Sequence, residues 1–145
     1  MILYMDTSAL LKKYFQEVGS KDVISKWKEA AGIVTSTVTY AEIMASIHRK
    51  RREGSENDKL LRGVINLFQE DWNTFIQVAV TNDLNESIDR ILLYHPLRGF
   101  DAIHLASALI VRENVPGKFL FACFDRRLNT AAQAEGLNTL PASPS

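Results

Sequence analysis

Four carboxylates in this sequence lie beside apolar segments, and together they could bind a hard cation. They are Asp6, Glu42, Asp101 and Asp125. Carboxylates gathered at one place repel one another, and a buried unpaired carboxylate costs several kcal/mol. A divalent cation would remove this cost, and a set of oxygen ligands favours Mg²⁺ or Mn²⁺. Such a cation polarises a phosphoryl group and generates hydroxide from bound water, which is the chemistry of phosphodiester hydrolysis.

Each of these acids also fits an ordinary structural role. Asp6, Asp101 and Asp125 each stand where an apolar run meets a helical pattern, which is the position of a helix N-cap. Thr39 to Glu42 matches a capping box, in which Glu42 would accept a hydrogen bond from the Thr39 amide. For a single acid the cap is the commoner explanation. The four together favour a site, because Glu42 and Asp101 begin helices with broad apolar faces.

The elements that would bring the acids together follow from the apolar pattern. Runs of apolar or β-branched residues predict strands at 2–5, 33–36, 75–80, 119–124 and, at the edge, 137–140. Helical spacing fills the segments between them. This alternation predicts an α/β fold, a three-layer α/β/α sandwich around a central parallel sheet. Ligands of such sheets bind at the carboxyl ends of the strands, and two predicted strands end at Asp6 and Asp125.

The predicted helices in the middle of the chain form a separate feature. A helix starting at Thr37 or Thr39 becomes basic at 48–52 and breaks at Gly54, and a second helix follows it to about Trp72. These two helices are expected to form a hairpin that projects from the sheet. The basic stretch is either a contact for substrate phosphates or a solvated helix end.

The composition restricts the classes of protein to consider. The chain has 145 residues, 46% of them hydrophobic, so we expect a single domain over 1–145 with a loose tail at about 141–145. The net charge is zero, so any nucleic-acid site must be a local patch. Cys123 is the only cysteine, which excludes an internal disulfide and a Cys/His zinc cluster. The pattern lacks a signal peptide and a membrane-spanning stretch, so we expect a cytoplasmic protein with no membrane partner.

Four motifs, in order along nearly the whole chain, carry a family resemblance. They are YMDTSAL (4–10), TYAEI (39–43), FDAIHLASA (100–108) and FDRRL (124–128). In these motifs the sequence resembles the PIN-domain ribonucleases, and specifically the VapC-type toxins of bacterial and archaeal toxin–antitoxin pairs. The first and third motifs are fairly specific together, and none decides the matter alone.

The resemblance implies a function and a set of roles. It implies a PIN-like fold over the chain, a Mg²⁺- or Mn²⁺-dependent endoribonuclease activity on RNA, a homodimer and an inhibitory antitoxin protein. Asp6, Glu42, Asp101 and Asp125 would bind the metal, with metal-activated water attacking the phosphodiester in line. The family often has Thr or Ser two residues before the last acid, where this chain has Cys123. This departure leaves open whether Asp125 contacts the metal directly or through water.

Other residues beside these motifs have two interpretations each. Thr7 and Ser8 either hydrogen-bond a metal-bound water or a phosphate, or cap the first helix. Arg126 and Arg127 are candidates for contacts with a substrate phosphate, which add salt-dependent affinity. His104 either supports a carboxylate or is an ordinary buried histidine with its hydrogen bonds satisfied, and we favour the second.

Three alternatives stay open at this level. A phosphatase of the haloacid dehalogenase type also starts with a strand ending in Asp, but it requires a second Asp two positions later, where this chain has Ser8. A PIN-domain RNA-maturation nuclease would share the motifs, and the short single domain favours a toxin instead. A catalytically inert RNA- or protein-binding module would keep the fold alone, and the presence of all four acids disfavours it.

Overall fold

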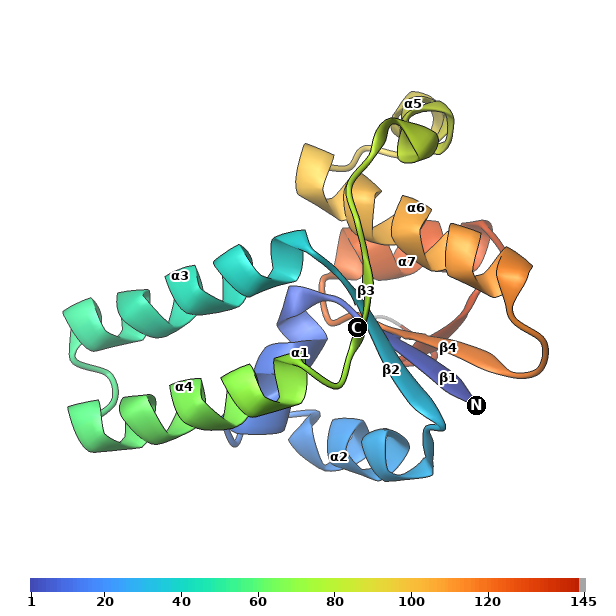
Figure 1. Ribbon diagram of the computed structural model, residues 1–145. Coiled ribbons are helices and arrows are strands. Elements are labelled where there is room, and N and C mark those ends of the chain that lie inside the picture. The colour runs from blue at the N-terminus through green and yellow to red at the C-terminus, as the bar shows by residue number, and fades with distance from the viewer. Residues whose placement is uncertain (144–145) are drawn as a thin grey trace.

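The computed structural model shows a parallel sheet through the middle of the molecule, with helices on both faces (Figure 1). It describes residues 1–143. The strands are β1 (Ile2–Met5), β2 (Gly32–Ser36), β3 (Ile76–Val78), β4 (Phe119–Ala122) and β5 (Asn138–Leu140). The helices are α1 (Thr7–Tyr14), α2 (Ser20–Glu29), α3 (Val38–Glu53), α4 (Asp58–Trp72), α5 (Asn85–Tyr94), α6 (Gly99–Asn114) and α7 (Arg126–Ala134), with a 3₁₀ turn at Asn82–Leu84.

The strand order places the ends of β1 and β4 side by side. The order is β3-β2-β1-β4-β5, and every neighbouring pair is parallel. The chain builds β1, β2 and β3 outward in one direction, then returns to the other side of β1 for β4 and β5. Met5 pairs with Ala122 at the carboxyl ends of the two central strands. The predicted parallel sheet is confirmed, and its switch point lies between β1 and β4, where ligands of open α/β sheets bind.

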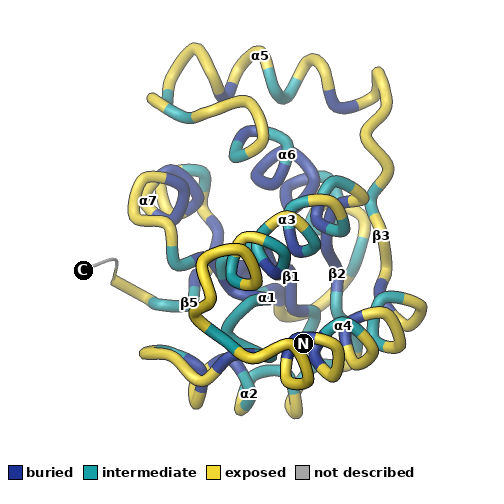
Figure 2. Tube along the Cα trace, turned by 90° about the vertical axis from the view of Figure 1, so that its left-hand side faces the viewer, coloured by how far each residue is buried: buried dark blue, intermediate teal, exposed yellow. Residues whose placement is uncertain are grey.

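Alternate side chains of β1 face two separate cores, which makes the fold three-layered. Leu3 and Met5 lie in one core, together with apolar residues of α1 to α4. Tyr4 lies in the other core, together with residues of α5, α6 and α7. Helix α6 is the most deeply buried of these helices, as its dark colour in Figure 2 shows. The predicted α/β/α sandwich is confirmed.

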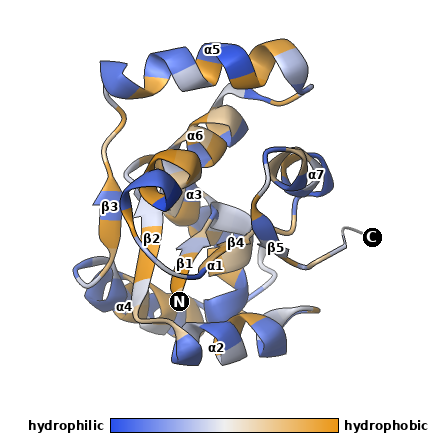
Figure 3. Ribbon diagram, turned by 90° about the vertical axis from the view of Figure 1, so that its right-hand side faces the viewer, coloured by the Kyte–Doolittle hydropathy of each residue, from blue (hydrophilic) through white to orange (hydrophobic). Residues whose placement is uncertain are grey.

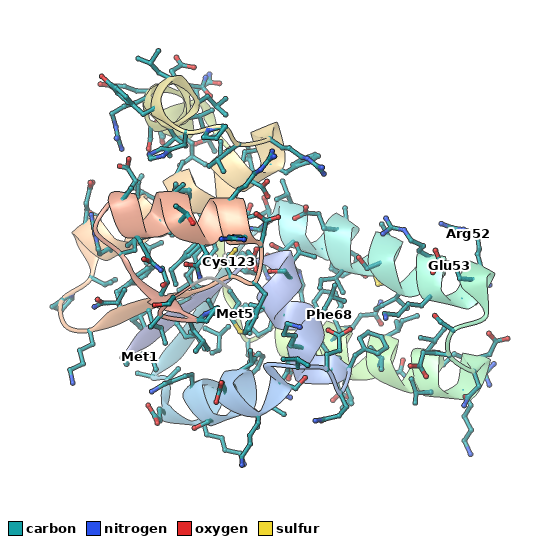
Figure 4. The ribbon with its side chains drawn as sticks, turned by 180° about the vertical axis from the view of Figure 1, so that it is seen from behind. Met1, Met5, Arg52, Glu53, Phe68 and Cys123 are labelled. Carbon is teal, nitrogen blue, oxygen red and sulfur yellow. The ribbon has the colours of Figure 1, made fainter. Side chains whose placement is uncertain are left out.

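Helices α3 and α4 form the predicted hairpin and extend well beyond the sheet (Figure 1). Arg52 and Glu53 lie at its far end (Figure 4). Gly54 ends α3 with φ 68°, a left-handed conformation that suits glycine. Near the sheet, Tyr40 of α3 packs its ring against Phe68 and Trp72 of α4. The projecting part is therefore anchored by aromatic contacts at its base.

Some segments differ in extent from their predictions, and β4 covers Phe119–Ala122 instead of 119–124, so it ends three residues before Asp125. Strand β3 covers Ile76–Val78 instead of 75–80, because it pairs only with β2 and its chain leaves the sheet after that pairing. The tail predicted at about 141–145 falls partly outside the described residues, which end at 143. Within them, the carbonyl oxygens of Pro141 and Ala142 accept hydrogen bonds from side chains of α7. No helix in the described part of the chain has the length and apolar character to cross a membrane.

Candidate active site

Asp6 directly follows β1 and is 4% exposed. Its Oδ1 accepts hydrogen bonds from Ser8 Oγ at 2.7 Å and from the Ala9 amide at 2.9 Å, so Asp6 is the N-cap of α1. The Ser8 hydroxyl in turn accepts from the Phe124 amide, which ties the end of β1 to the segment after β4. Burial raises the pKa of Asp6 in spite of these donors. The fold therefore buries a carboxylate whose ionised form is energetically unfavourable.

Glu42 reaches the same place from α3. Its Oε1 accepts a hydrogen bond from Thr7 Oγ1 at 2.7 Å and lies 2.8 Å from His104 Nε2. Burial opposes ionisation, but the bonds from His104 and Thr7 outweigh it and hold the pKa of Glu42 below its ordinary value. The capping-box interpretation is wrong, because α3 begins at Val38 with Thr37 as its cap, and the Glu42 carboxylate bonds to α1 and α6 instead.

His104 links Glu42 to the core of the sheet. Its Nδ1 lies 2.9 Å from the Tyr4 hydroxyl, and both side chains are buried. Since an ionised Glu42 only accepts, Nε2 carries the ring hydrogen, and in the neutral ring Nδ1 accepts from Tyr4. His104 is thus both a buried histidine with satisfied nitrogens and the support of a carboxylate. Sequence reasoning missed Tyr4, whose only signal was a hydroxyl inside an otherwise apolar strand.

The other two predicted acids, the outer acids, line a surface cavity that does not include Asp6 or Glu42. Asp101 is the third residue of α6 and is half-exposed; Arg98 holds the cap position of that helix, so the cap interpretation of Asp101 is wrong. Asp125 is exposed and is the N-cap of α7, with its Oδ1 accepting from the Leu128 amide at 3.0 Å. For Asp125 the cap is therefore real, and it leaves the second carboxylate oxygen for another partner.

The four acids lie within electrostatic reach of one another. Burial raises the pKa of Asp101, and the charges of Asp125 and Asp6, then that of Glu42, raise it further. No three His, Cys, Asp or Glu side chains of residues 1–143 lie close enough, as they stand, to hold a metal ion. The structure thus brings the predicted acids to one edge of the sheet but not into a closed ligand cage.

Cys123 occupies the interior just before Asp125 (Figure 4). Its Sγ donates a hydrogen bond to the Asp125 carbonyl oxygen at 3.4 Å. Burial, and next the charge of Asp6, raise the pKa of the thiol, so it stays protonated. Cys123 therefore supports the turn into α7 and does not supply the oxygen that Thr or Ser would have at this place.

A surface cavity of about 280 Å³ lies beside the outer acids. Its walls are Pro96, Arg98, Asp101, Asp125, Arg126 and Arg127. The predicted Arg126 and Arg127 are thus placed next to the acids. Sequence reasoning missed Arg98, and its only signal was its position three residues before Asp101.

Comparison with known proteins identifies the family. A family model described as the PIN domain matches residues 3–133. The chain belongs to the PIN-domain family. Two curated relatives of this PIN domain, Ribonuclease VapC45 and Ribonuclease VapC49 from strains of Mycobacterium tuberculosis, are each 31% identical to it over 97% of this chain and 96% of their own length. The VapC-type PIN domain predicted from the motifs is therefore confirmed.

Solved structures share the fold of this PIN domain. A toxin–antitoxin complex from Klebsiella pneumoniae matches with a TM-score of 0.66 and 17% identity over 99% of each chain. FitAcB from Neisseria gonorrhoeae also matches with a TM-score of 0.66, with 14% identity over 92% of this chain and 94% of the FitAcB chain. Mycobacterium tuberculosis VapC20, named a sarcin-ricin loop cleaving toxin, gives 0.62, with 18% identity over 93% and 95%. At these identities the likeness concerns the fold alone.

Proposed function

We propose that this PIN domain is a divalent-metal-dependent endoribonuclease and the toxin of a toxin–antitoxin pair. The observation that carries the proposal is the meeting of four acids from α3, α6 and the segments after β1 and β4, where burial and then the charges of the other three raise the pKa of Asp101. Acids whose charges disfavour one another at a sheet's switch point suit a cation site better than a structural role. The family membership supplies the type of reaction.

Mg²⁺ or Mn²⁺ fits this site by the chemistry of its donors. The acids offer only oxygen atoms, which hard cations prefer, and a cation would relieve the repulsion that Asp101 experiences. Asp6 and Glu42 would hold the cation from the inner side, and Asp101 and Asp125 from the outer side. Both outer acids line the surface cavity. When bound, the cation polarises the phosphate and generates hydroxide from water.

The protein's own residues would orient the reacting groups. Thr7 and Ser8 donate to the inner acids and so hold one oxygen of each in place. Arg126 and Arg127 would bind a substrate phosphate next to the outer acids. Asp6 and Asp101 are the residues on which we expect activity to depend most.

An antitoxin protein and a second copy of the chain are the proposed protein partners. Leu93, Tyr94 and Phe100, near the junction of α5 and α6, are 75%, 69% and 57% exposed. Helix α5 lies over α6 at the edge of the molecule, with both polar and apolar residues (Figure 3). Exposed apolar side chains in one region are typical of surfaces that a partner covers. Sedimentation of the purified chain would test the homodimer.

The experiment that tests the function is cleavage of a mixed RNA pool by purified protein. The reactions contain Mn²⁺, Mg²⁺ or EDTA, and Asp6→Asn protein prepared in parallel is the control. We expect cutting that requires the metal and is lost in the variant. Equal cutting by both proteins would indicate a contaminating nuclease. No cutting with either metal, together with no metal-induced rise in melting temperature, would contradict the proposal and favour an inert binding module.

A further inference from the structure

Two adjoining cavities lie beside the outer acids, and they share a wall. The first, of about 280 Å³, contains Asp101 and Asp125. The second, of about 340 Å³, is lined by His95, Pro96, Arg126, Arg127, Thr130 and Ala131. Pro96, Arg126 and Arg127 belong to both. The two cavities are therefore neighbours, one beside the acids and the other along α7, and we call them together the groove.

Arginines line the first cavity without being neutralised by its acids. Arg98, Arg126 and Arg127 are all exposed, and within residues 1–143 none of them lies within 4.0 Å of a carboxylate oxygen as an ion pair. Their charges remain free although Asp101 and Asp125 line the same cavity. A guanidinium presents a planar set of donors that matches a phosphate group in two-point contact. This wall therefore suits an anion that enters beside the acids.

The second cavity has a different character. Apart from the shared arginines, its walls are the small or apolar side chains of Pro96, Thr130 and Ala131 and the ring of His95. His95 Nε2 lies 2.7 Å from Glu135, which also binds Arg90 at 2.8 Å, so the ring is held in place. A cavity of this size and lining is suited to a flat, mostly apolar group.

We propose that this groove is a nucleotide subsite for single-stranded RNA, a proposal that rests on the ribonuclease function. Arg98, Arg126 and Arg127 bind the phosphate that neighbours the scissile one, and the cavity around Pro96 and Thr130 takes the attached base. The order of the two cavities supports this: the charged part adjoins the acids, and the less polar part lies beyond it. A base inside a duplex is stacked and paired, so only an unpaired nucleotide can enter. An acidic protein segment would need cations along its whole length, and beyond the shared arginines the second cavity offers only Pro96, Thr130, Ala131 and a His95 ring that already contacts Glu135.

The subsite has a kinetic signature distinct from that of the acids. Its arginines contact a phosphate that does not react, so their removal should raise KM and leave kcat nearly unchanged. For the loss of one exposed ion pair, the expected rise in KM is on the order of fivefold. Loss of one phosphate contact should also reduce the slope of log affinity against log salt by about 0.7, the value for single strands.

The test uses the full chain and a fluorescent, mixed-sequence single-stranded RNA of about twelve nucleotides as the probe. Arg98→Ala and Arg127→Ala are compared with Arg62→Ala, an exposed arginine of α4 outside the groove, in steady-state cleavage. Binding is measured separately, by anisotropy at several salt concentrations, with the same changes made in Asp6→Asn protein so that no cutting occurs. We expect the two groove variants to show higher KM and shallower salt slopes than Arg62→Ala.

The base subsite is tested by filling the second cavity. Thr130→Trp changes an exposed residue of α7, and abasic RNA of equal length provides the comparison. We expect protein with the natural Thr130 to bind ordinary RNA more tightly than abasic RNA, and the Thr130→Trp protein to bind both equally. Groove variants that match Arg62→Ala while the wild type cuts RNA would overturn the subsite alone.

Two further outcomes separate the proposals. An oligoglutamate peptide that competes as well as RNA of equal charge would overturn the RNA subsite and assign the groove to an acidic protein segment. Failure of the wild type to cut any RNA with metal would overturn the ribonuclease function, and the subsite would fall with it.

Discussion

The inner and outer halves of the acid site are built differently. Asp6 and Glu42, on the inner side, each have one oxygen held by two donors, both from α1 for Asp6 and from α1 and α6 for Glu42. Asp101 and Asp125, on the outer side, are half-exposed or exposed, and Asp125 has a single donor from its own helix. The inner acids are therefore held by paired donors, whereas the outer acids line the surface cavity.

This difference indicates a division of labour. Burial makes the inner carboxylate of Asp6 costly to ionise, but hydrogen bonds give it a fixed geometry. The outer carboxylate of Asp101 is opposed both by burial and by the charges around it. With the inner pair held by donors and the outer pair at the surface cavity, a cation between them would lie beside an entering substrate. Substitutions of Asp6 or Glu42 should therefore alter the geometry of the site, and substitutions of Asp101 or Asp125 should alter mainly its charge.

The largest effect should follow removal of charge from the inner half. We expect Asp6→Asn to lower metal-dependent cleavage at least about 100-fold, the size found when one preorganised electrostatic contact is lost. Its melting temperature without metal should stay equal or rise at pH 7, because the amide can still cap α1 and no longer buries a charge. Cleavage assays and thermal melts would measure both. A variant that is inactive only because it is strongly destabilised would contradict this account of Asp6.

The support of Glu42 by His104 should have the next largest effect. His104→Leu leaves Glu42 without this donor, and loss of such an outer contact typically costs about 10- to 100-fold in activity or metal affinity. His104→Gln keeps an N–H donor and should recover part of the loss. Mn²⁺ titration by calorimetry, beside cleavage, gives the measurement. Equal affinities for Mn²⁺ in the wild type and His104→Leu would show that the inner half does not depend on this bond.

Tyr4→Phe examines the same connection from the other side of His104. The change removes the hydroxyl that faces Nδ1 and leaves the buried nitrogen without its partner, at a cost of about 1–3 kcal/mol. We expect lower stability in urea, and a smaller fall in activity than with His104→Leu because Nε2 can still donate to Glu42. A Tyr4→Phe protein of unchanged stability would contradict the assigned hydrogen bond.

Two changes at Asp125 separate its helix cap from its charge in the outer half. Asp125→Asn keeps a cap acceptor and removes the charge, so activity should fall while stability is retained. Asp125→Ala removes both and should also lose about 1 kcal/mol of stability. The comparison of cleavage rates and melting temperatures gives the result. If the Asn protein is fully active, the charge of Asp125 has no part in the reaction.

The smallest effect concerns the pH dependence of stability without metal. The folded protein raises the pKa of Asp101 above its ordinary value, so the folded state binds its proton more tightly than the unfolded state. This contribution to stability is present at low pH and is lost as pH rises through the raised pKa. Glu42 has the opposite sign, because its pKa is lowered and its contribution is lost as pH falls.

Asp101→Asn should therefore melt higher than the wild type near neutral pH and lose that advantage in acid. Melting curves between pH 3.5 and 7 would show this, and added Mn²⁺ should reduce the difference by stabilising only the wild type. A variant that melts lower than the wild type at pH 7 without metal would contradict repulsion in the outer half.

Local patterns in the sequence were enough to establish the fold and the candidate acids of this protein. Apolar runs ending at Asp6 and Asp125 predicted parallel strands with acids at one edge, and in the structure Asp6 directly follows β1 and Asp125 lies three residues after β4. Apolar side chains recur every second residue in a strand and about every 3.6 residues in a helix. Both patterns involve residues close together in the chain, so a single sequence is enough to recognise them. The family motifs follow the same local spacing.

Only the tertiary structure decided how the acids are held. Glu42 bonds to His104, 62 residues away, and His104 to Tyr4, 100 residues away, so no local pattern could reveal either bond. The capping box at Thr39 failed because α3 begins one residue earlier, at Val38, and the Glu42 carboxylate bonds to Thr7 and His104 instead. The groove of Arg98 with Arg126 also joins segments far apart in the chain. Hydrogen bonds and charges act through space, and packing of the layers determines which of them meet.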